Sequence, residues 1–286
     1  MIQKLLKTVI STLYFLTTLS ALVTQAQEVR PITIAILAKD KAHTLPLFLK
    51  CIENQTWPSE KTYLYIKTNN NNDNTVEILE KWIETVKDRY PKIYFDCENV
   101  TENIEQFSQH TWNSVRFKVL GKIRGNSIKW AIENDSDYFV VDCDNFIKAH
   151  TIESLASANL PIVAPFLKLA RPILYSNYHA DVDDHGYFKG CQLYYDIFNQ
   201  IDPGCHKVPV VHCSYFIQNS ALPFMSYDDN SYRYEYVIFS DVARKNNIDQ
   251  YIDNRDVYGL ITFAETAQEL EQETTVPGVL SWTNNQ

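Results

Sequence analysis

Apolar strand-like runs alternate with amphipathic helical patterns along the first half of this chain, and this alternation most constrains its fold. Residues 32–38 read ITIAILA, a continuous β-branched run that predicts a strand buried on both faces. Four strand–helix repeats with short links predict an α/β fold, in which helices flank a mostly parallel central sheet. The further strands are expected at residues 63–67, 93–97 and 137–141, and the helices at residues 45–52, 74–90 and 115–134.

One helix start is marked by its own residue pattern. Asn74 is followed three residues later by Glu77, which is a capping-box spacing. We therefore expect Asn74 to cap the helix with its side chain.

The second half of the chain has a different character. Beyond Ile162 it is richer in Tyr, Pro and Asp, and residues 186–195 and 208–217 suggest antiparallel or mixed strand pairing. Residues 235–246 have a helical pattern. We expect one domain over residues 27–263 and a loosely packed polar tail over residues 264–286.

The first 26 residues have the layout of a signal peptide. Lys4 and Lys7 precede an apolar run over residues 10–23, and Ala26 offers a cleavage position. The alternative is an uncleaved anchor, but the run is short for a membrane span. We expect cleavage, no stable span afterwards, and the secretory pathway as the location: the ER lumen or secretion, or the periplasm in a bacterium.

The net charge of −9 excludes two classes of partner, because nucleic acids and anionic membranes both require a basic face. A small anionic substrate stays possible. The six cysteines lack paired zinc spacing. Cys191, Cys205 and Cys213 are the expected disulfide formers, whereas Cys51 and Cys97 are expected as free core thiols.

Asp142-Cys143-Asp144 directly follows the fourth predicted strand. Alternate residues of an extended segment point the same way, so both carboxylates can reach one cation. Carboxylate oxygens suit Mg²⁺, Mn²⁺ or Ca²⁺, and such an ion could stabilise a diphosphate leaving group. The alternative is a strand-end residue followed by a turn or helix cap. Residues 39–40 and 69–73 follow the first two strands and should reach the same rim, where ligands of such sheets bind.

Several sequence blocks, in order, resemble the N-terminal domain of the procollagen galactosyltransferases of glycosyltransferase family 25. The likeness runs from about residue 32 to 260. The blocks are Ile34-Ala35-Ile36-Leu37-Ala38 with Ala42-His43-Thr44-Leu45-Pro46, Asp73-Asn74-Thr75, Asp142-Cys143-Asp144-Asn145, Leu160-Pro161-Ile162-Val163-Ala164-Pro165, Tyr175-Ser176-Asn177, Val208-Pro209-Val210-Val211-His212 and Tyr258-Gly259.

The resemblance implies a GT-A type nucleotide-diphospho-sugar transferase fold, a UDP-sugar donor, Mn²⁺, and transfer of galactose to hydroxylysine of collagen. Asp142 and Asp144 match the metal ligands. Two of the remaining assignments have a plainer alternative. His212 is expected to be a further metal ligand or a phosphate contact, and the alternative is a strand histidine satisfied by hydrogen bonds. Asp73 and Asn74 are expected to contact the donor nucleoside, and the alternative is that they only cap a helix. By family likeness alone, Tyr175 and Asn177 line the donor or acceptor pocket.

Two departures from the family pattern concern the step after metal binding. The procollagen enzymes carry a second transferase domain that has no counterpart here. Where the family has an Asp-Asp pair, this chain has Tyr234-Glu235. An inverting transferase needs a base near the acceptor hydroxyl. Glu235 and Asp241 are the candidates, with Asp183 and Asp184 as rivals, and solvated surface charge is the alternative for each.

Three functions stay open on these grounds. The first is a metal-dependent transfer of a hexose from a UDP-sugar to a hydroxyl of a collagen-like protein. The second keeps the enzyme class but uses lipopolysaccharide or another glycan as acceptor. The third is a catalytically degenerate binding or adhesion module, because a fold does not fix a function.

Overall fold

The computed structural model describes residues 29–101 and 113–274, and one compact unit begins at Pro31. The predicted signal peptide lies outside the described residues. Within the two described ranges, no helix is both long enough and apolar enough to cross a membrane.

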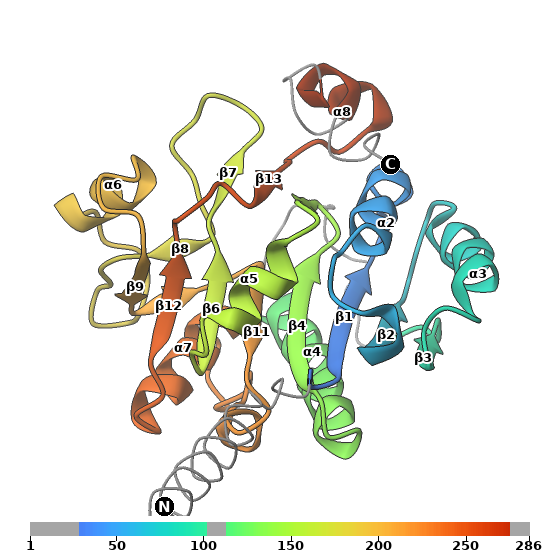
Figure 1. The fold of residues 1–286 in the computed structure, drawn as a ribbon, viewed down its shortest axis with the longest axis horizontal. Helices are drawn as coiled ribbons and strands as arrows, with labels where there is room; N and C mark the ends of the chain where they lie inside the picture. Colours follow the sequence, from blue (N-terminus) through green and yellow to red (C-terminus); the bar gives the residue numbers. More distant parts are fainter. Residues whose placement is uncertain (1–28, 102–112, 275–286) are drawn as a thin grey trace, which may run out of the picture. The chain divides into compact units, whose positions relative to one another are not determined.

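Among the described residues, eight strands form one sheet in the order β3-β2-β1-β4-β11-β6-β12-β9 (Figure 1). The first four strands are parallel, with Ile32 of β1 opposite Thr62 and Asp137. β11 lies antiparallel between β4 and β6, and β12 runs parallel to β6. The strands are β1 (Ile32–Ala38), β2 (Thr62–Thr68), β3 (Lys92–Asp96), β4 (Asp137–Asp142), β6 (Ile162–Pro165), β9 (Cys205–Val208), β11 (Ser214–Ile217) and β12 (Gln250–Asp253).

Helices cover both faces of this sheet, because its strands are apolar on both sides. Ile34 and Ile36 of β1 pack in the core beneath α2, α3 and α5, whereas Ala35 faces the core beneath α4, α6 and α7 (Figure 1). This arrangement confirms the predicted α/β architecture. The helices are α2 (Leu45–Glu53), α3 (Thr75–Val86), α4 (Ser114–Glu133), α5 (Thr151–Ser157), α6 (Gln192–Phe198) and α7 (Glu235–Lys245).

The capping box predicted for α3 is wrong. Asn74 occupies the N-cap position but makes no side-chain capping hydrogen bond. Instead, Asp73 Oδ1 accepts a hydrogen bond from the Thr75 amide at 3.0 Å. The preceding carboxylate is the stronger acceptor and already faces the first helical amides, so it replaces Asn74 in this role.

Short elements complete the second half of the chain. β5 (Asn145–Ile147), β13 (Gly259–Ile261) and β7 (Leu167–Leu169) form a small sheet, and β8 (Tyr178–His179) pairs with β10 (Val210–Val211). Of the pairing expected over residues 186–195, one antiparallel bridge is present, between Phe188 and Val182, and α6 begins at Gln192. The short 3₁₀ helices are η2 (Ser59–Lys61) and η4 (Leu222–Phe224).

The predicted polar tail is packed as far as it is described. Residues 267–274 form α8 (Ala267–Thr274), in which Leu270 and Glu273 are buried. Glu273 pairs with Arg171 and accepts from Thr262. Residues 275–286 lie outside the described part of the chain.

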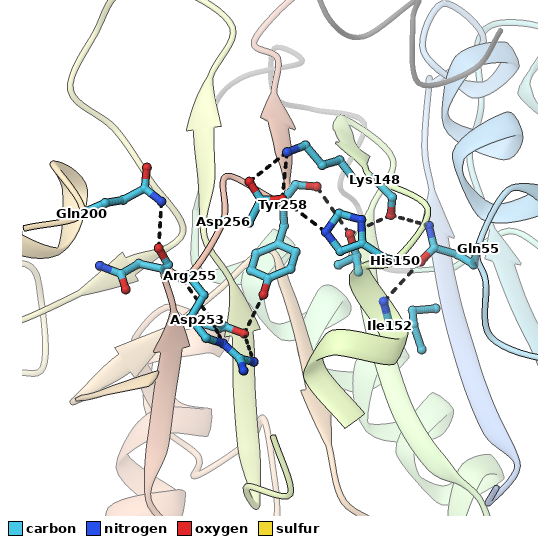
Figure 2. A network of polar contacts seen from close by, with 11 residues as sticks. Gln55, Lys148, His150, Ile152, Gln200, Asp253, Arg255, Asp256 and Tyr258 are labelled. Atoms are coloured by element: carbon cyan, nitrogen blue, oxygen red, sulfur yellow. Dashed lines mark hydrogen bonds and ion pairs between the residues drawn. The ribbon is translucent and has the colours of Figure 1, made fainter. Parts of the chain in front are cut away.

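A polar network ties the loop after β12 to the start of α5 (Figure 2). Asp253 is fully buried and accepts from Arg255 and from the Tyr258 hydroxyl, the latter at 2.8 Å. Asp256 pairs with Lys148 at 2.9 Å. Charge-assisted bonds of this kind fix loops that carry little apolar surface. Gln55 bonds Lys148 and Ile152, His150 lies 3.2 Å from Asp256, and Gln200 bonds the Asn254 carbonyl.

All six cysteines are free thiols. The expected disulfides among Cys191, Cys205 and Cys213 are therefore wrong in this structure. Cys51 is buried as expected, but Cys97 is exposed. Cys97 follows edge strand β3, whose outer side has no neighbouring strand in the described sheet, and this explains its exposure.

Candidate active site

A cavity of about 1060 Å³ opens at the carboxyl ends of β1, β2 and β4. Its charged side is formed by residues that follow these strands, and we call Lys39, Asp40, Lys41, Asp142 and Asp144 the charged rim. The rim predicted from strand ends is thus present. Its position follows from the parallel pairing of the three strands, which brings their carboxyl ends to one edge.

Two cationic side chains form ion pairs with the two carboxylates of the Asp-x-Asp triplet. Lys41 Nζ lies 2.9 Å from Asp144 Oδ2, and Arg124 Nη2 donates to Asp142 Oδ1 at 2.7 Å. Burial raises the pKa of Asp142, although Arg124 opposes this shift. The two carboxylates are therefore charge-balanced by cationic side chains of the chain itself.

Arg124 also faces the candidate base. Its Nε lies 3.6 Å from Glu235 Oε1, and both side chains are about 95% buried. Neither Nε nor Nη1 of Arg124, nor Oε2 of Glu235, has a hydrogen-bond partner among the described residues. Burial raises the pKa of Glu235 to about 7, again against the influence of Arg124. A buried carboxylate with a free oxygen and a pKa near neutrality has the properties of a general base.

The loop between β1 and α2 is held by side chains of the loop after β2. Asp40, which has a φ of 52°, donates its amide to Asn71 and accepts from the Asn72 amide at 2.6 Å. Asp73 Oδ2 accepts from the Ala42 amide at 2.9 Å. Asp73 lines the cavity, but both its oxygens serve backbone amides. Asn74 is exposed and is not among the cavity residues.

Another part of the cavity lining is aromatic. We call Tyr175, His179, His212, Tyr236 and Phe263 the aromatic wall, since all five line the cavity and neighbouring rings lie 5.1–6.1 Å apart. Tyr175 thus lines the cavity, and its assignment to a donor or acceptor pocket stays a prediction.

Asn177 has a structural position instead. It is fully buried and is not among the cavity residues. Its amide bonds Leu167, Pro165 and Ser214. It therefore supports the wall without lining the cavity, because its amide is consumed in joining three backbone segments.

The other candidate carboxylates lie elsewhere. Asp241 is on α7 but pairs with Arg233 and Lys245 at 2.9 Å each, and is not among the cavity residues. Asp183 is exposed and accepts amides of its own turn, from His185 and Tyr187. Asp184 is exposed as well. Only Glu235 of these residues reaches the cavity.

Arg124, Lys41, His179 and Tyr236 were not identified from the sequence. Arg124 did leave a signal. Its neighbours on the buried face of α4 are Phe117, Gly121, Ile128 and Ala131. These positions are spaced by three or four residues, so Arg124 occupies the apolar stripe of its helix. A charged residue on such a stripe requires a buried partner, which is a functional indication.

The side-chain oxygens at this site could supply some, but not all, of the ligands that a hard divalent cation needs. Asp142 and Asp144 supply oxygen donors that Mn²⁺ accepts. Across the described ranges, however, no three His, Cys, Asp or Glu side chains come together as a metal cage. His212 therefore does not complete a three-ligand site; its Nδ1 lies 2.9 Å from Cys213 Sγ. Water or substrate oxygens would have to supply the remaining ligands.

The sheet order and the strand-end cavity are those of the GT-A type nucleotide-diphospho-sugar transferase fold, and solved structures share this fold. One is GalNAc-T7 with UDP, GalNAc and Mn²⁺, at a TM-score of 0.55 and 9% identity over 87% of this chain and 48% of that chain. Another is S. aureus TarS 1-349 in complex with UDP-GlcNAc, at a TM-score of 0.53 and 13% identity over 82% of this chain and 59% of that one.

The chain belongs to glycosyltransferase family 25: the model of that family's N-terminal domain matches residues 30–277. Mouse procollagen galactosyltransferase 2 is 29% identical over 84% of this chain and 40% of its own length. Zebrafish procollagen galactosyltransferase 1 is 30% identical over 80% and 39%. The mouse inactive glycosyltransferase 25 family member 3 is 26% identical over 85% and 43%. The chain thus spans about two fifths of the length of these relatives.

Proposed function

We propose that this chain transfers a hexose from a UDP-sugar to a hydroxyl acceptor, and that a divalent cation assists. The observation that carries the proposal is the placement of Asp142, Asp144 and Glu235 around one cavity. Asp142 and Asp144 at the end of β4 would form the cation site, whereas Glu235 comes from α7 and has a pKa that burial raises to about 7. A simple carbohydrate-binding module needs no such separation of roles.

Asp142 and Asp144 would hold the cation, most simply Mn²⁺, which would stabilise charge on the departing diphosphate. Lys41 and Arg124 occupy these carboxylates in the structure, so their positive charge lies close to where that diphosphate would sit. Both cations can then serve as additional diphosphate contacts. Lys39, Lys67 and Arg116 also line the cavity and favour an anionic donor.

Glu235 is the proposed general base. In its ionised form it would accept the proton of the acceptor hydroxyl as that oxygen attacks the sugar. Arg124 keeps this carboxylate near Asp142 and orients it. Asp241 stays a weaker candidate, since its oxygens are already bonded to cations outside the cavity.

The finer assignments rest on the relatives. Their names support galactose as the sugar and a collagen-like protein as the acceptor. Hydroxylysine as the acceptor residue is what the family resemblance implies, and the predicted signal peptide supports the secretory pathway as the location. A glycan acceptor is the alternative within the enzyme class. The inactive mouse relative favours a second candidate, a degenerate binding module that retains the fold.

Turnover of UDP-galactose in the presence of Mn²⁺ tests the proposal. We expect UDP release that EDTA abolishes, and that Asp142→Asn lowers by at least about a hundredfold, since one lost charge contact in the transition state has this effect. Asp88→Asn, an exposed carboxylate outside the cavity, is the matched control. UDP-glucose and UDP-GlcNAc as donors decide the sugar. Wild-type turnover that survives EDTA overturns the metal role, and absence of turnover with every donor favours the binding module.

A further inference from the structure

The aromatic wall contains two imidazoles to which the proposed function assigns no role. His179, on β8, and His212, just before β11, are 93% and 94% buried, and their rings lie 5.4 Å apart. Both line the cavity. They come from segments more than thirty residues apart, which Asn177 joins by accepting the His212 amide at 3.0 Å.

His179 has unused hydrogen-bonding capacity. In the part of the chain that the structure describes, no partner bonds either of its ring nitrogens. Nδ1 is fully enclosed, so Nε2 is the nitrogen that a ligand in the cavity can reach. Burying an imidazole without a partner is costly, so such a group in a cavity indicates a ligand that completes it. Burial lowers the pKa of His179 to about 4, which leaves the ring neutral at physiological pH.

Two tyrosines of the aromatic wall also have unused hydrogen-bonding capacity. The hydroxyls of Tyr175 and Tyr236 also have no hydrogen-bond partner among the residues described, and the His179 and Tyr236 rings lie 5.8 Å apart. Tyr236 directly follows the candidate base Glu235. Neutral imidazoles and phenols can each donate and accept a hydrogen bond. An alcohol has the same dual character, whereas an ammonium group only donates.

Every lysine and arginine of the cavity lining lies before residue 125 in the sequence, and the aromatic wall itself contains none. The aromatic wall therefore offers no cation for a diphosphate, but it offers neutral groups next to the base. We propose that His179, with Tyr236, forms a subsite that binds the acceptor hydroxyl and presents it to Glu235. This inference rests on the proposed function. His179 is then a specificity-determining residue for an uncharged alcohol.

Comparing transfer with donor hydrolysis tests this subsite. Hydrolysis of UDP-galactose uses water as the acceptor and does not need the subsite. We expect His179→Ala to raise the acceptor KM at least about tenfold, the effect of one lost hydrogen bond of about 1.4 kcal/mol. Hydrolysis should stay within about twofold of wild type. His179→Gln, whose side-chain amide can replace Nε2, should restore the acceptor KM to within about threefold.

The experiment uses two acceptors, a hydroxylysyl collagen-like peptide and a hexose glycoside. The acceptor whose KM rises in His179→Ala is the one whose hydroxyl the subsite binds. His185→Ala, an exposed histidine outside the cavity, is the control and should change neither reaction. Thermal unfolding checks that each variant is folded. An unchanged acceptor KM in His179→Ala overturns the subsite while the proposed function stands. An equal loss of hydrolysis and transfer assigns His179 a structural role. A wild-type protein without any turnover overturns both proposals.

Discussion

Arg124 Nη2 donates to Asp142 Oδ1 at 2.7 Å while its Nε lies 3.6 Å from Glu235 Oε1, so one buried guanidinium bridges the two carboxylates. Removing one partner from a buried ion pair is expensive, because it leaves a buried charge without compensation. In Arg124→Met, the carboxylates of Asp142 and Glu235 both lose this cationic partner. We expect the free energy of unfolding in urea to fall by about 3–5 kcal/mol. Lys87→Met, which breaks only an exposed pair with Glu84, should leave the unfolding midpoint unchanged. A similar stability for both variants would refute the bridging role.

Glu235→Gln removes the proposed base but keeps the size and shape of the side chain. We expect kcat to fall by about 10²–10⁴-fold while the donor KM changes little, as for loss of general-base catalysis. Asp241→Asn tests the other candidate carboxylate and should leave kcat within about twofold. Steady-state kinetics with UDP-galactose measures both, and a larger effect of Asp241→Asn would reverse the assignment.

The pH dependence of transfer follows from the pKa of Glu235, which burial raises to about 7. The ionised carboxylate accepts a proton and the protonated form does not. Transfer should therefore increase with pH up to about 7 and level off above it, with a tenfold change per unit on the acid side. The residual activity of Glu235→Gln should lack this limb. A wild-type profile that is flat from about pH 5.5 to 8 would argue against Glu235 as the base.

The network of Figure 2 predicts a stability effect without a catalytic one. Tyr258→Phe removes the hydroxyl that donates to the fully buried Asp253 at 2.8 Å. A lost hydrogen bond to a buried charge costs about 1.5–3 kcal/mol, measurable by urea unfolding. Tyr195→Phe removes a hydroxyl that no described residue bonds, and should have no effect. Equal stability of the two variants would show that Arg255 alone satisfies Asp253.

Gly259 begins β13 at a point where strand backbones approach closely. A Cβ at this position would collide with the Phe146 carbonyl oxygen and lie 3.0 Å from Ile147 Cα. We expect Gly259→Ala to destabilise the fold by about 1–3 kcal/mol through overpacking. Gly190→Ala, where nothing lies within 4 Å, serves as the control in the same thermal unfolding measurement. A stable Gly259→Ala variant would mean that the strands can move apart freely.

The sequence predicted most accurately the features that rest on local patterns. The strands β1 to β4 and the helix α4 lie within one residue of their expected positions, because each carries its own hydrophobic period. The rim containing Asp142 then follows from parallel pairing alone. Arg124, in contrast, stands on a helix eighteen residues away from its partner, and only the packing of α4 against the sheet brings the two together.

The predictions that were wrong concern contacts set by tertiary structure. Asn177 looked like a pocket residue, but its amide is used to join β6, β7 and β11. The cysteines suggested disulfides by their proximity in sequence, yet Cys191 precedes α6 whereas Cys205 begins β9. His179 was missed because a two-residue strand leaves no periodic signal.

The cavity lining is drawn from two parts of the chain. Its lysines and arginines come from residues 39–124, whereas the aromatic wall and the candidate base Glu235 come from residues 175–263. These two parts share one sheet, because β11 of the later part pairs with β4 of the earlier part. Recombination between the two parts would therefore replace strand contacts of the fold together with the cavity lining. New acceptors are expected to arise through substitutions within the cavity rather than through a single crossover.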